Sequence, residues 1–368
     1  GPIWGEESRR RNLGEGIWRG GGTPGYPSPM ASVLIDSVLV ERSGVVLVDH
    51  LTLPVEDQEL LVLIGPSGSG KTTLLRVVAG LEEATSGDVL FDGRSMDGVA
   101  PARRDVAMVF QDNALIPGKT VRKNVSFPLE VHHVEKEEID QRVLAETRTL
   151  AIDRFLDRMP NQLAAGHQQL VQAARALVRR PSLFLLDEPL SRMDAANRRM
   201  MRSEIRLLQA GYGVTTLYTT NDQEEAMAVA DRIAVIDGGR IRQLGTPDEI
   251  YHEPVDTFVA GFVGSPSMSF LRGEVSDREV HLSAGSLPVP PQTPSGPVTV
   301  GIRPHDWHRV PTAGLHGFVA GLERHGDHSF AIVDIGTDEI VMRFDEDQPA
   351  LGDDVEIWPR RFHLFGPT

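Results

Sequence analysis

Unbroken apolar runs alternate with helical stretches over most of the chain. The runs Leu60–Ile64 and Leu183–Leu186 contain no polar residue. Such runs are typical of strands that are buried on both faces of a parallel sheet. The pattern therefore predicts an α/β domain with a parallel sheet, which we place at residues 30–265.

A helical insert interrupts this alternation, and we place it at about residues 112–180. Within it, Lys136–Met159 carries apolar side chains at helical spacing, namely Ile139, Val143, Leu144, Leu150 and Leu156. This spacing predicts amphipathic helices. Their apolar faces could serve core packing, docking of another protein, or both on different faces.

The last part of the chain has a different pattern. After Phe270, short β-type runs separated by glycine and proline are found at Val298–Ile302, Ala331–Ile335 and Ile340–Phe344. They predict a small all-β barrel of the oligonucleotide/oligosaccharide-binding type, which we place at residues 266–368. Residues 286–297 hold five prolines, and we interpret them as a linker.

Composition narrows the class of protein. Residues 1–29 contain eight glycines and four prolines without an apolar period. We expect this leader to be disordered, as an upstream extension or a cloning remnant, and not a short signal peptide. No apolar stretch approaches the ~20 residues that span a bilayer.

Cysteine usage and charge exclude further classes. The chain has no cysteine, so disulfides and thiolate chemistry are excluded, which fits a reducing cytosol. A net charge of -15 argues against a nucleic-acid partner, because the long-range field would repel phosphate backbones. Several histidines lack the carboxylate or cysteine pattern of a metal site; these are His132, His133, His305, His308, His325 and His328.

A glycine-rich loop follows the first apolar run. It has the phosphate-loop pattern GxxxxGK[ST], formed by Gly65, Pro66, Ser67, Gly68, Ser69, Gly70, Lys71, Thr72 and Thr73. Glycines let successive N–H groups point into one concavity, and the following helix adds its positive end. Lys71 would neutralise the β and γ phosphates, and Thr72 would be a neutral ligand of Mg²⁺. The alternative is a strand-to-helix turn without a ligand.

An acidic pair ends the second apolar run. Asp187 can hold Mg²⁺ through water, and Glu188 is then placed to polarise an attacking water. The alternative is an ordinary strand end with two exposed carboxylates. Together with the loop, the pair predicts binding and hydrolysis of a nucleoside triphosphate.

Further motifs follow the order found in ATP-binding-cassette ATPases; they are Val109-Phe110-Gln111, Leu163–Gln169, Pro189–Ala195 and Tyr218–Gln223. The chain resembles this family from about Ser32 to Phe365. The later segments Gln243–Pro247, Phe258–Pro266 and Gly301–Pro304 are similar to the family's maltose-type importers of sugars, polyols and glycerophosphodiesters. The resemblance implies ATP and Mg²⁺ as cofactors, Gln111 at the metal and the attacking water, and Asp194 as the D-loop aspartate.

The resemblance also implies partners and a location. Two cassettes of this family close head to tail and dock on two transmembrane permease subunits at the cytoplasmic face of the cell membrane. A complete importer adds an extracytoplasmic solute-binding protein. Residues Lys136–Met159 correspond to the docking helices, and Ala114–Gly118 lies where a coupling helix is received. The C-terminal domain would stabilise the dimer and receive regulators or effectors.

The signature motif departs from the family pattern. The family's LSGGQ reads Leu163–His167 here. Ala164 replaces the serine that reaches the γ-phosphate across the dimer. Ala165 replaces a glycine where close approach to phosphate favours no side chain, whereas Gly166 is retained.

Three other positions also depart from it. Asn221 replaces the switch histidine, and asparagine can donate a hydrogen bond but cannot become a cation near neutral pH. Arg42 stands where an aromatic ring stacks on adenine; it could stack on the base or be solvated. Arg192 replaces the usual asparagine of the D-loop.

These departures favour pairing with a second, unlike and more intact ATPase chain over a homodimer in which Ala164 and Asn221 are tolerated drift. The leading hypothesis is an ATPase subunit that couples hydrolysis of MgATP to uptake of a carbohydrate-class solute. Two alternatives are a nucleotide-binding regulatory subunit with little turnover of its own and a soluble cassette protein without a channel. The transported solute cannot be read from these residues.

Overall fold

The computed structural model describes residues 32–111, 115–191, 193–326, 328–345 and 349–366. The chain forms two compact units, one that ends at Pro247 and one that begins at Asp248. The second unit thus begins earlier than the boundary that we placed at residue 265. The predicted leader at residues 1–29 lies outside the described residues.

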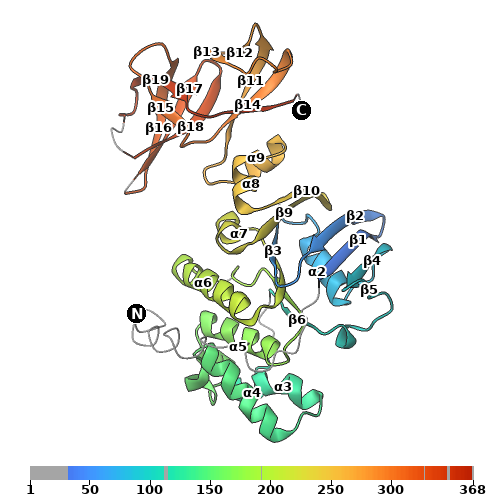
Figure 1. Cartoon of the computed structure of the whole chain (residues 1–368). Coiled ribbons are helices and arrows are strands. Elements are labelled where there is room, and N and C mark those ends of the chain that lie inside the picture. The colour runs from blue at the N-terminus through green and yellow to red at the C-terminus, as the bar shows by residue number, and fades with distance from the viewer. Residues whose placement is uncertain (1–31, 112–114, 192, 327, 346–348, 367–368) are drawn as a thin grey trace, which may run out of the picture. The chain divides into compact units, whose positions relative to one another are not determined.

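The first unit contains a six-stranded sheet in the order β10-β9-β3-β8-β7-β6, of which Figure 1 labels β3, β6, β9 and β10. Its strands are β3 (Leu60–Ile64), β6 (Val106–Val109), β7 (Leu183–Asp187), β8 (Thr215–Thr220), β9 (Arg232–Asp237) and β10 (Arg240–Gly245). All pairs are parallel except β9 with β10. Every residue of β3, β7 and β8 is buried, as parallel strands covered on both faces require. The predicted parallel sheet is confirmed.

Helices follow three of the parallel strands. They are α2 (Lys71–Ala79) after β3, α6 (Ala195–Tyr212) after β7 and α7 (Gln223–Val229) after β8. Parallel strands end at the same edge of their sheet, and ligands bind beyond that edge in open α/β folds. The topology therefore brings the phosphate loop, the acidic pair and the switch segment to one edge.

An antiparallel sheet in the order β2-β1-β4-β5 packs against α2. Its strands are β1 (Val33–Arg42), β2 (Val45–Val55), β4 (Ser86–Phe91) and β5 (Arg94–Ser95). Leu74 and Leu75 of α2 are fully buried in a core that both sheets share. This core fixes α2, and with it the phosphate loop, to the edge of the parallel sheet.

The predicted insert is helical. It contains α3 (Val121–Val131), α4 (Lys136–Thr149) and α5 (Ala165–Leu177). Short 3₁₀ turns lie at Asp153–Phe155 and Pro160–Gln162, and another precedes β6 at Pro101–Arg103. The predicted apolar positions Ile139, Val143, Leu150 and Leu156 are buried in one cluster with α5 and α6, so these positions serve core packing.

The second unit contains two antiparallel five-stranded sheets. One has the order β13-β12-β11-β14-β20, with β11 (Ser269–Ser276), β12 (Glu279–Leu282), β13 (Gly285–Pro288), β14 (Gly296–Ile302) and β20 (His363–Phe365). The other has the order β15-β19-β16-β17-β18, with β15 (Trp307–Arg309), β16 (Leu315–Arg324), β17 (Ser329–Ile335), β18 (Asp338–Phe344) and β19 (Asp354–Pro359). Both sheets contribute to one core. The prediction of a small all-β domain is confirmed.

The proline-rich stretch 286–297 lies between two strands of the second unit. Its first residues belong to β13, which pairs with β12, and its last two belong to β14, which pairs with β11. Proline is accepted there because Pro288 ends an outer strand and Pro297 lies near the start of its strand. Residues 289–295 thus link β13 to β14, inside the domain that we placed at residues 266–368.

Arg303 joins the helices of the second unit to its sheets. These helices are α8 (Pro247–His252) and α9 (Thr257–Phe262). The guanidinium is 2% exposed, donates to the carbonyl of Tyr251 (2.8 Å) and that of Ala260 (3.2 Å), and lies 4.2 Å from the centre of the Tyr251 ring. A cation is favourable at carbonyls that end a helix.

Across the described residues, no helix is long and apolar enough to cross a membrane.

Candidate nucleotide-binding and hydrolysis site

The phosphate loop lies between β3 and α2, and glycine is required at several of its positions. Gly68 and Gly70 have φ angles of 83° and 99°, in the left-handed region that favours glycine. A Cβ atom on Gly65 would lie 2.0 Å from the carbonyl oxygen of Ile236. The loop therefore has the tight backbone path that the pattern predicts.

Lys71 folds back over this loop. Its ammonium donates to the carbonyls of Gly65 (2.8 Å) and Pro66 (2.9 Å) and to the hydroxyl of Ser69 (3.2 Å), and the residue is 4% exposed. Burial lowers the pKa of Lys71, and the carboxylates of Glu188 and Asp187 oppose this shift. The ammonium is thus held inside the loop, where phosphate oxygens could replace the carbonyls as its partners.

Asp187 is the centre of a cluster of oxygen ligands. The Thr72 hydroxyl donates to its Oδ1 atom at 2.9 Å, and the Thr219 hydroxyl donates to the same atom at 2.8 Å. Asp187 is 3% exposed. A hydroxyl and a carboxylate at this separation suit a hard cation such as Mg²⁺, which prefers oxygen ligands. Thr72 and Asp187 therefore fit the predicted metal site.

Both carboxylate oxygens of Glu188 accept hydrogen bonds from amide side chains. Gln111 donates to Oε2 at 3.0 Å, and Asn221 donates to Oε1 at 2.7 Å. Three segments that follow β6, β7 and β8 meet here. The main chain of Glu188 has a φ angle of 44°, and its N–H donates to the Thr219 carbonyl at 3.0 Å. The structure thus brings the three predicted catalytic residues together.

The signature segment forms the N-terminus of α5. Ala164 is its N-cap and has no side-chain capping bond, Ala165 is its first residue, and Gly166 is buried. Gln168, in the first turn of α5, donates its side-chain N–H to the carbonyls of Pro160 and Leu163, which precede the helix, both at 3.0 Å. These bonds hold the backbone of the signature without the serine hydroxyl that the family has there.

His167 replaces the signature glutamine and lies partly buried. Its ring packs edge-on against Phe155, with ring centres 4.5 Å apart. Its Nε2 atom is buried and has no hydrogen-bond partner among the described residues. Burial, together with the nearby charges of Arg154 and Arg158, lowers the pKa of His167. The environment therefore favours the neutral imidazole.

Asp194 caps a helix. It is the N-cap of α6, and its carboxylate accepts from the N–H groups of Ala196 (3.1 Å) and Asn197 (3.0 Å) and from the Asn197 side chain (2.6 Å). The hydrogen bonds from Asn197 lower the pKa of Asp194. A capping role thus accounts for this residue within one chain, and its predicted contact with nucleotide across a dimer stays a prediction. Arg192 lies outside the described residues.

Arg42 is at the end of β1 and is paired with an acidic group. Its Nη2 atom lies 2.7 Å from Oε1 of Glu82, and its side chain is 59% exposed. The guanidinium is thus restrained by an ion pair while most of its surface faces solvent. Its predicted stacking on a base stays a prediction.

Sequence reasoning missed Thr219. Its hydroxyl donates to Asp187, and its carbonyl accepts from the N–H of Glu188. The available signal was the pair of threonines that ends the buried strand β8, because polar side chains at the carboxyl end of a parallel strand often line a site.

Sequence reasoning also missed Asn124. Its side chain bonds to backbone atoms of Ile116, Lys119 and Thr120, and so fixes the described part of the expected docking segment.

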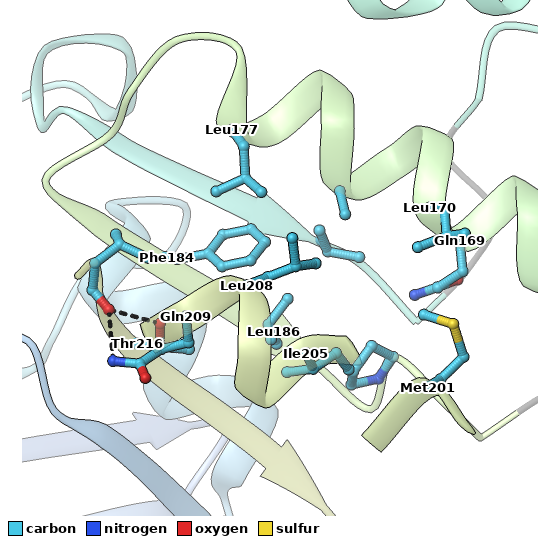
Figure 2. Close-up of a pocket in the computed structure, with 14 residues that line it drawn as sticks. Gln169, Leu170, Leu177, Phe184, Leu186, Met201, Ile205, Leu208, Gln209 and Thr216 are labelled. Atoms are coloured by element: carbon cyan, nitrogen blue, oxygen red, sulfur yellow. Dashed lines mark hydrogen bonds between the residues drawn. The ribbon is translucent and has the colours of Figure 1, made fainter. Parts of the chain in front are cut away.

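An apolar cavity of about 30 Å³ lies behind the catalytic strands (Figure 2). It is enclosed by side chains of β7, α5 and α6, including Leu170, Leu177, Phe184, Leu186, Met201, Ile205 and Leu208. Few polar groups are present to orient a ligand. The cavity is therefore a gap in the packing between helices and sheet, and the chemistry lies at the strand ends.

The fold and these side chains define a P-loop ATPase with an appended β domain. A family model described as "ABC transporter" matches residues 48–191, and one described as "MalK OB fold domain" matches residues 264–306. Three relatives carry the name sn-glycerol-3-phosphate import ATP-binding protein UgpC. The protein from Ruegeria pomeroyi is 41% identical over 92% of this chain and 98% of its own length.

The two others are similar over shorter spans. The protein from Rhizobium meliloti is 46% identical over 75% of this chain and 78% of its own length, and that from Bartonella quintana is 50% identical over 66% and 70%. The solved structure of cbiO1 from Clostridium perfringens, part of the ABC transporter complex cbiONQ, has a TM-score of 0.57 at 24% identity. It covers 61% of this chain and 92% of its own chain, and supports the fold.

The chain belongs to the ATP-binding subunits of ABC importers, of the type that carries a MalK OB fold domain. It is an ATP-binding protein whose family hydrolyses ATP to drive import. The resemblance and the enzyme class predicted from the sequence are confirmed.

Proposed function

We propose that this chain hydrolyses MgATP to drive uptake of a glycerophosphate-type solute. The observation that carries the hydrolytic part is the clamp on Glu188, whose two carboxylate oxygens accept from Gln111 and Asn221. The solute is proposed from the names of the relatives, because specificity in an importer resides in its channel and binding protein. A regulatory subunit with little turnover is not favoured, since the relatives are named as import ATP-binding proteins.

In this proposal, the chain's own residues position the reactants. The loop N–H groups and Lys71 bind the phosphates. Thr72 and Asp187, with Gln111, would hold Mg²⁺, which supplies positive charge to the β and γ phosphates. Glu188 orients water and takes its proton, and the two amide donors hold its carboxylate in position. Asn221 thus acts as a neutral donor to the carboxylate.

The proposal includes a head-to-tail dimer, in which Ala164, Ala165, Gly166 and Asp194 face the nucleotide of the other subunit. We propose that the other subunit is a second, unlike ATPase. This choice rests only on the altered signature and switch residues, and none of the relatives' names points to such a chain. A homodimer remains the competing arrangement.

The proposal also includes two permease subunits at the cytoplasmic face of the membrane and an extracytoplasmic solute-binding protein. Support comes from the importer family and from the ordered segment Ile116–Thr120. Asn124 is fully buried and holds this segment through four hydrogen bonds of 2.8–3.2 Å. A segment held in one conformation can couple movements between subunits better than a flexible loop can.

The test is uptake by the reconstituted importer. The complex is purified from its native membrane, its ATPase chains are identified by mass spectrometry, and it is placed in vesicles containing ATP. We expect uptake of sn-glycerol 3-phosphate that is lost with Glu188→Gln. Uptake that survives this substitution contradicts the assigned catalytic role, whereas ATP-driven uptake of a different solute contradicts only the solute. A single ATPase species contradicts the unlike partner.

A further inference from the structure

The second unit has an open seam between two strands of one sheet. β15 and β18 are the outer strands in the order β15-β19-β16-β17-β18. They face each other across a pocket of about 470 Å³. The backbone N–H of Arg343 donates across this seam to the carbonyl of Pro304, at 2.8 Å. The pocket therefore results from the curvature of the sheet, which brings its two outer strands near each other.

Positive side chains gather at this seam. Arg309, Arg343 and Arg360 line the pocket, with His305 and His308. Arg343 is paired with Asp345, at 2.8 Å. Neither Arg309 nor Arg360 has an acidic partner within the described parts of the chain. The chain as a whole has a net charge of -15, so arginines without an acidic partner at one pocket indicate that this pocket favours an anionic ligand.

Backbone contacts hold two of these arginines against the same turn. Arg343 donates its N–H to Pro304, and Arg360 donates its N–H to Asp306 at 2.7 Å. The turn between them carries His305, whose Nε2 atom lies 3.9 Å from the Asp306 carboxylate. The fold thus fixes the main chain of Arg343 and Arg360 at the edge of one pocket.

The bottom of the pocket is apolar. Trp307, Met342 and Phe344 line it and are buried. Trp307 is 2% exposed, and its indole N–H has no acceptor within the described ranges. A buried N–H group without an acceptor is rare in folded proteins. A cationic rim over an apolar floor suits a compact molecule that has an anionic group and a small organic body.

We propose that this seam binds a small oxyanion, either a phosphate ester or a carboxylate. Arginine forms paired hydrogen bonds with both kinds of group. An extended polyanion such as RNA is disfavoured, because the acidic chain repels it over long distances. The acidic residues Glu346 and Asp347 follow Asp345 in the sequence and lie outside the described residues. The site is in the second unit, and the proposal does not depend on the solute that is transported.

Calorimetric titration with inorganic phosphate, with malonate and with uncharged glycerol tests this site. Because phosphate can also bind the phosphate loop, the full-length chain carries Lys71→Ala, and a second series uses the parent chain saturated with MgADP. Ionic strength is held constant. We expect one saturable anion site per chain in both series, with no binding of glycerol.

Variants then locate the anion. Arg309→Gln with Arg360→Gln should weaken binding about 100-fold, since each charge-assisted hydrogen bond accounts for roughly tenfold. Arg309→Lys with Arg360→Lys should retain part of the affinity, because the charges remain. The matched control is Arg272→Gln, an exposed arginine on β11 of the same unit, which should leave affinity unchanged.

Three results would overturn the proposal: no saturable anion binding, unchanged affinity in the double glutamine variant, or equal loss in the Arg272→Gln control. Binding of phosphate alone assigns the site to phosphate esters. Binding of malonate alone assigns it to carboxylates, and binding of both supports a general oxyanion site. Circular dichroism of each variant separates a lost site from a lost fold.

Discussion

Two helix N-termini in the first unit have the same backbone task but different side chains. The phosphate loop before α2 combines glycines in the left-handed region with Lys71, whose ammonium has three oxygen partners. The signature before α5 has Ala164 at its N-cap, without a side-chain bond, and His167 with a buried nitrogen lacking a partner in the described ranges. Each helix has the positive end of its dipole at this N-terminus. The comparison shows that a helix N-terminus provides only its backbone N–H groups and dipole, whereas binding and catalysis depend on the side chains placed there.

The largest effect should come from removing the cation of the intact site. Lys71→Ala deletes the charge opposite the phosphates, where each charge-assisted hydrogen bond contributes roughly 1.5–3 kcal/mol. We expect ATP binding to be abolished in equilibrium titrations. Lys71→Arg, which keeps the charge with a larger head group, is the matched variant. If the alanine variant binds MgATP as tightly as the parent, the loop is not the phosphate site.

The clamp on Glu188 should have the next largest effect. Asn221→Ala removes the donor to Oε1, and losing one preorganised contact commonly costs about 10²- to 10³-fold in rate. We expect the isolated chain to hydrolyse ATP slowly, and we expect Asn221→His to raise this rate because it provides an imidazole for the γ-phosphate. Steady-state phosphate release measures both.

Glu188→Gln is the control for this pair of variants, and it should silence any rate that Asn221→His restores. A rapid parent enzyme whose rate does not change in any Asn221 variant would show that the substitution is neutral drift.

Repair of the signature should have a smaller effect, which depends on the partner. The triple variant Ala164→Ser, Ala165→Gly, His167→Gln restores the serine, glycine and glutamine of the signature. We expect it to give up to about 10²-fold faster hydrolysis at the opposite site. In a homodimer this repair should reinforce Asn221→His at every site. In a heterodimer the two should act at different sites, which single-turnover measurements can separate.

Ala164→Asn separates chemistry from helix capping. Both serine and asparagine at the N-cap stabilise a helix by about 1 kcal/mol relative to alanine, but only serine provides the small hydroxyl. We expect equal stabilisation of the unit in denaturant titrations and faster hydrolysis only with serine. Faster hydrolysis with asparagine would assign the gain to helix capping.

Base selection should change modestly. Because Arg42 is paired with Glu82 and no aromatic ring is at this position, we expect ATP and GTP to compete within about tenfold of each other. Arg42→Tyr should tighten ATP binding by about tenfold through stacking. Arg42→Gln is the matched variant for loss of charge alone. A strong adenine preference in the parent would mean that another ring, from this chain or its partner, stacks on the base.

The smallest effect concerns pH. Burial lowers the pKa of His167 below its unfolded value, near 6.5. The neutral ring therefore stabilises the fold fully above about pH 6.5, and this contribution is lost as the pH falls through that value toward the lowered pKa. We expect the parent to lose slightly more stability than His167→Gln between pH 7.5 and 5.5, measured by urea denaturation. Identical pH profiles would contradict a buried, neutral imidazole.

Local patterns were enough to predict much of the first unit. The apolar runs gave β3 and β7, and the glycine spacing gave the phosphate loop, because both depend on short stretches of chain with strong backbone preferences. The helix α3 was covered only by the broad insert, because Pro128 within it resembles a helix breaker.

The sequence by itself determined the parallel sheet, the phosphate loop, the acidic pair and a small β domain, since each follows from residues that are close in the chain. Only the tertiary structure decided that Asn221 and Gln111 bond to Glu188 and that Thr219 bonds to Asp187. It also decided that Arg309, Arg343 and Arg360 share one pocket. The physical reason is that strand order and register join residues that are distant in the chain, and no local preference records that pairing.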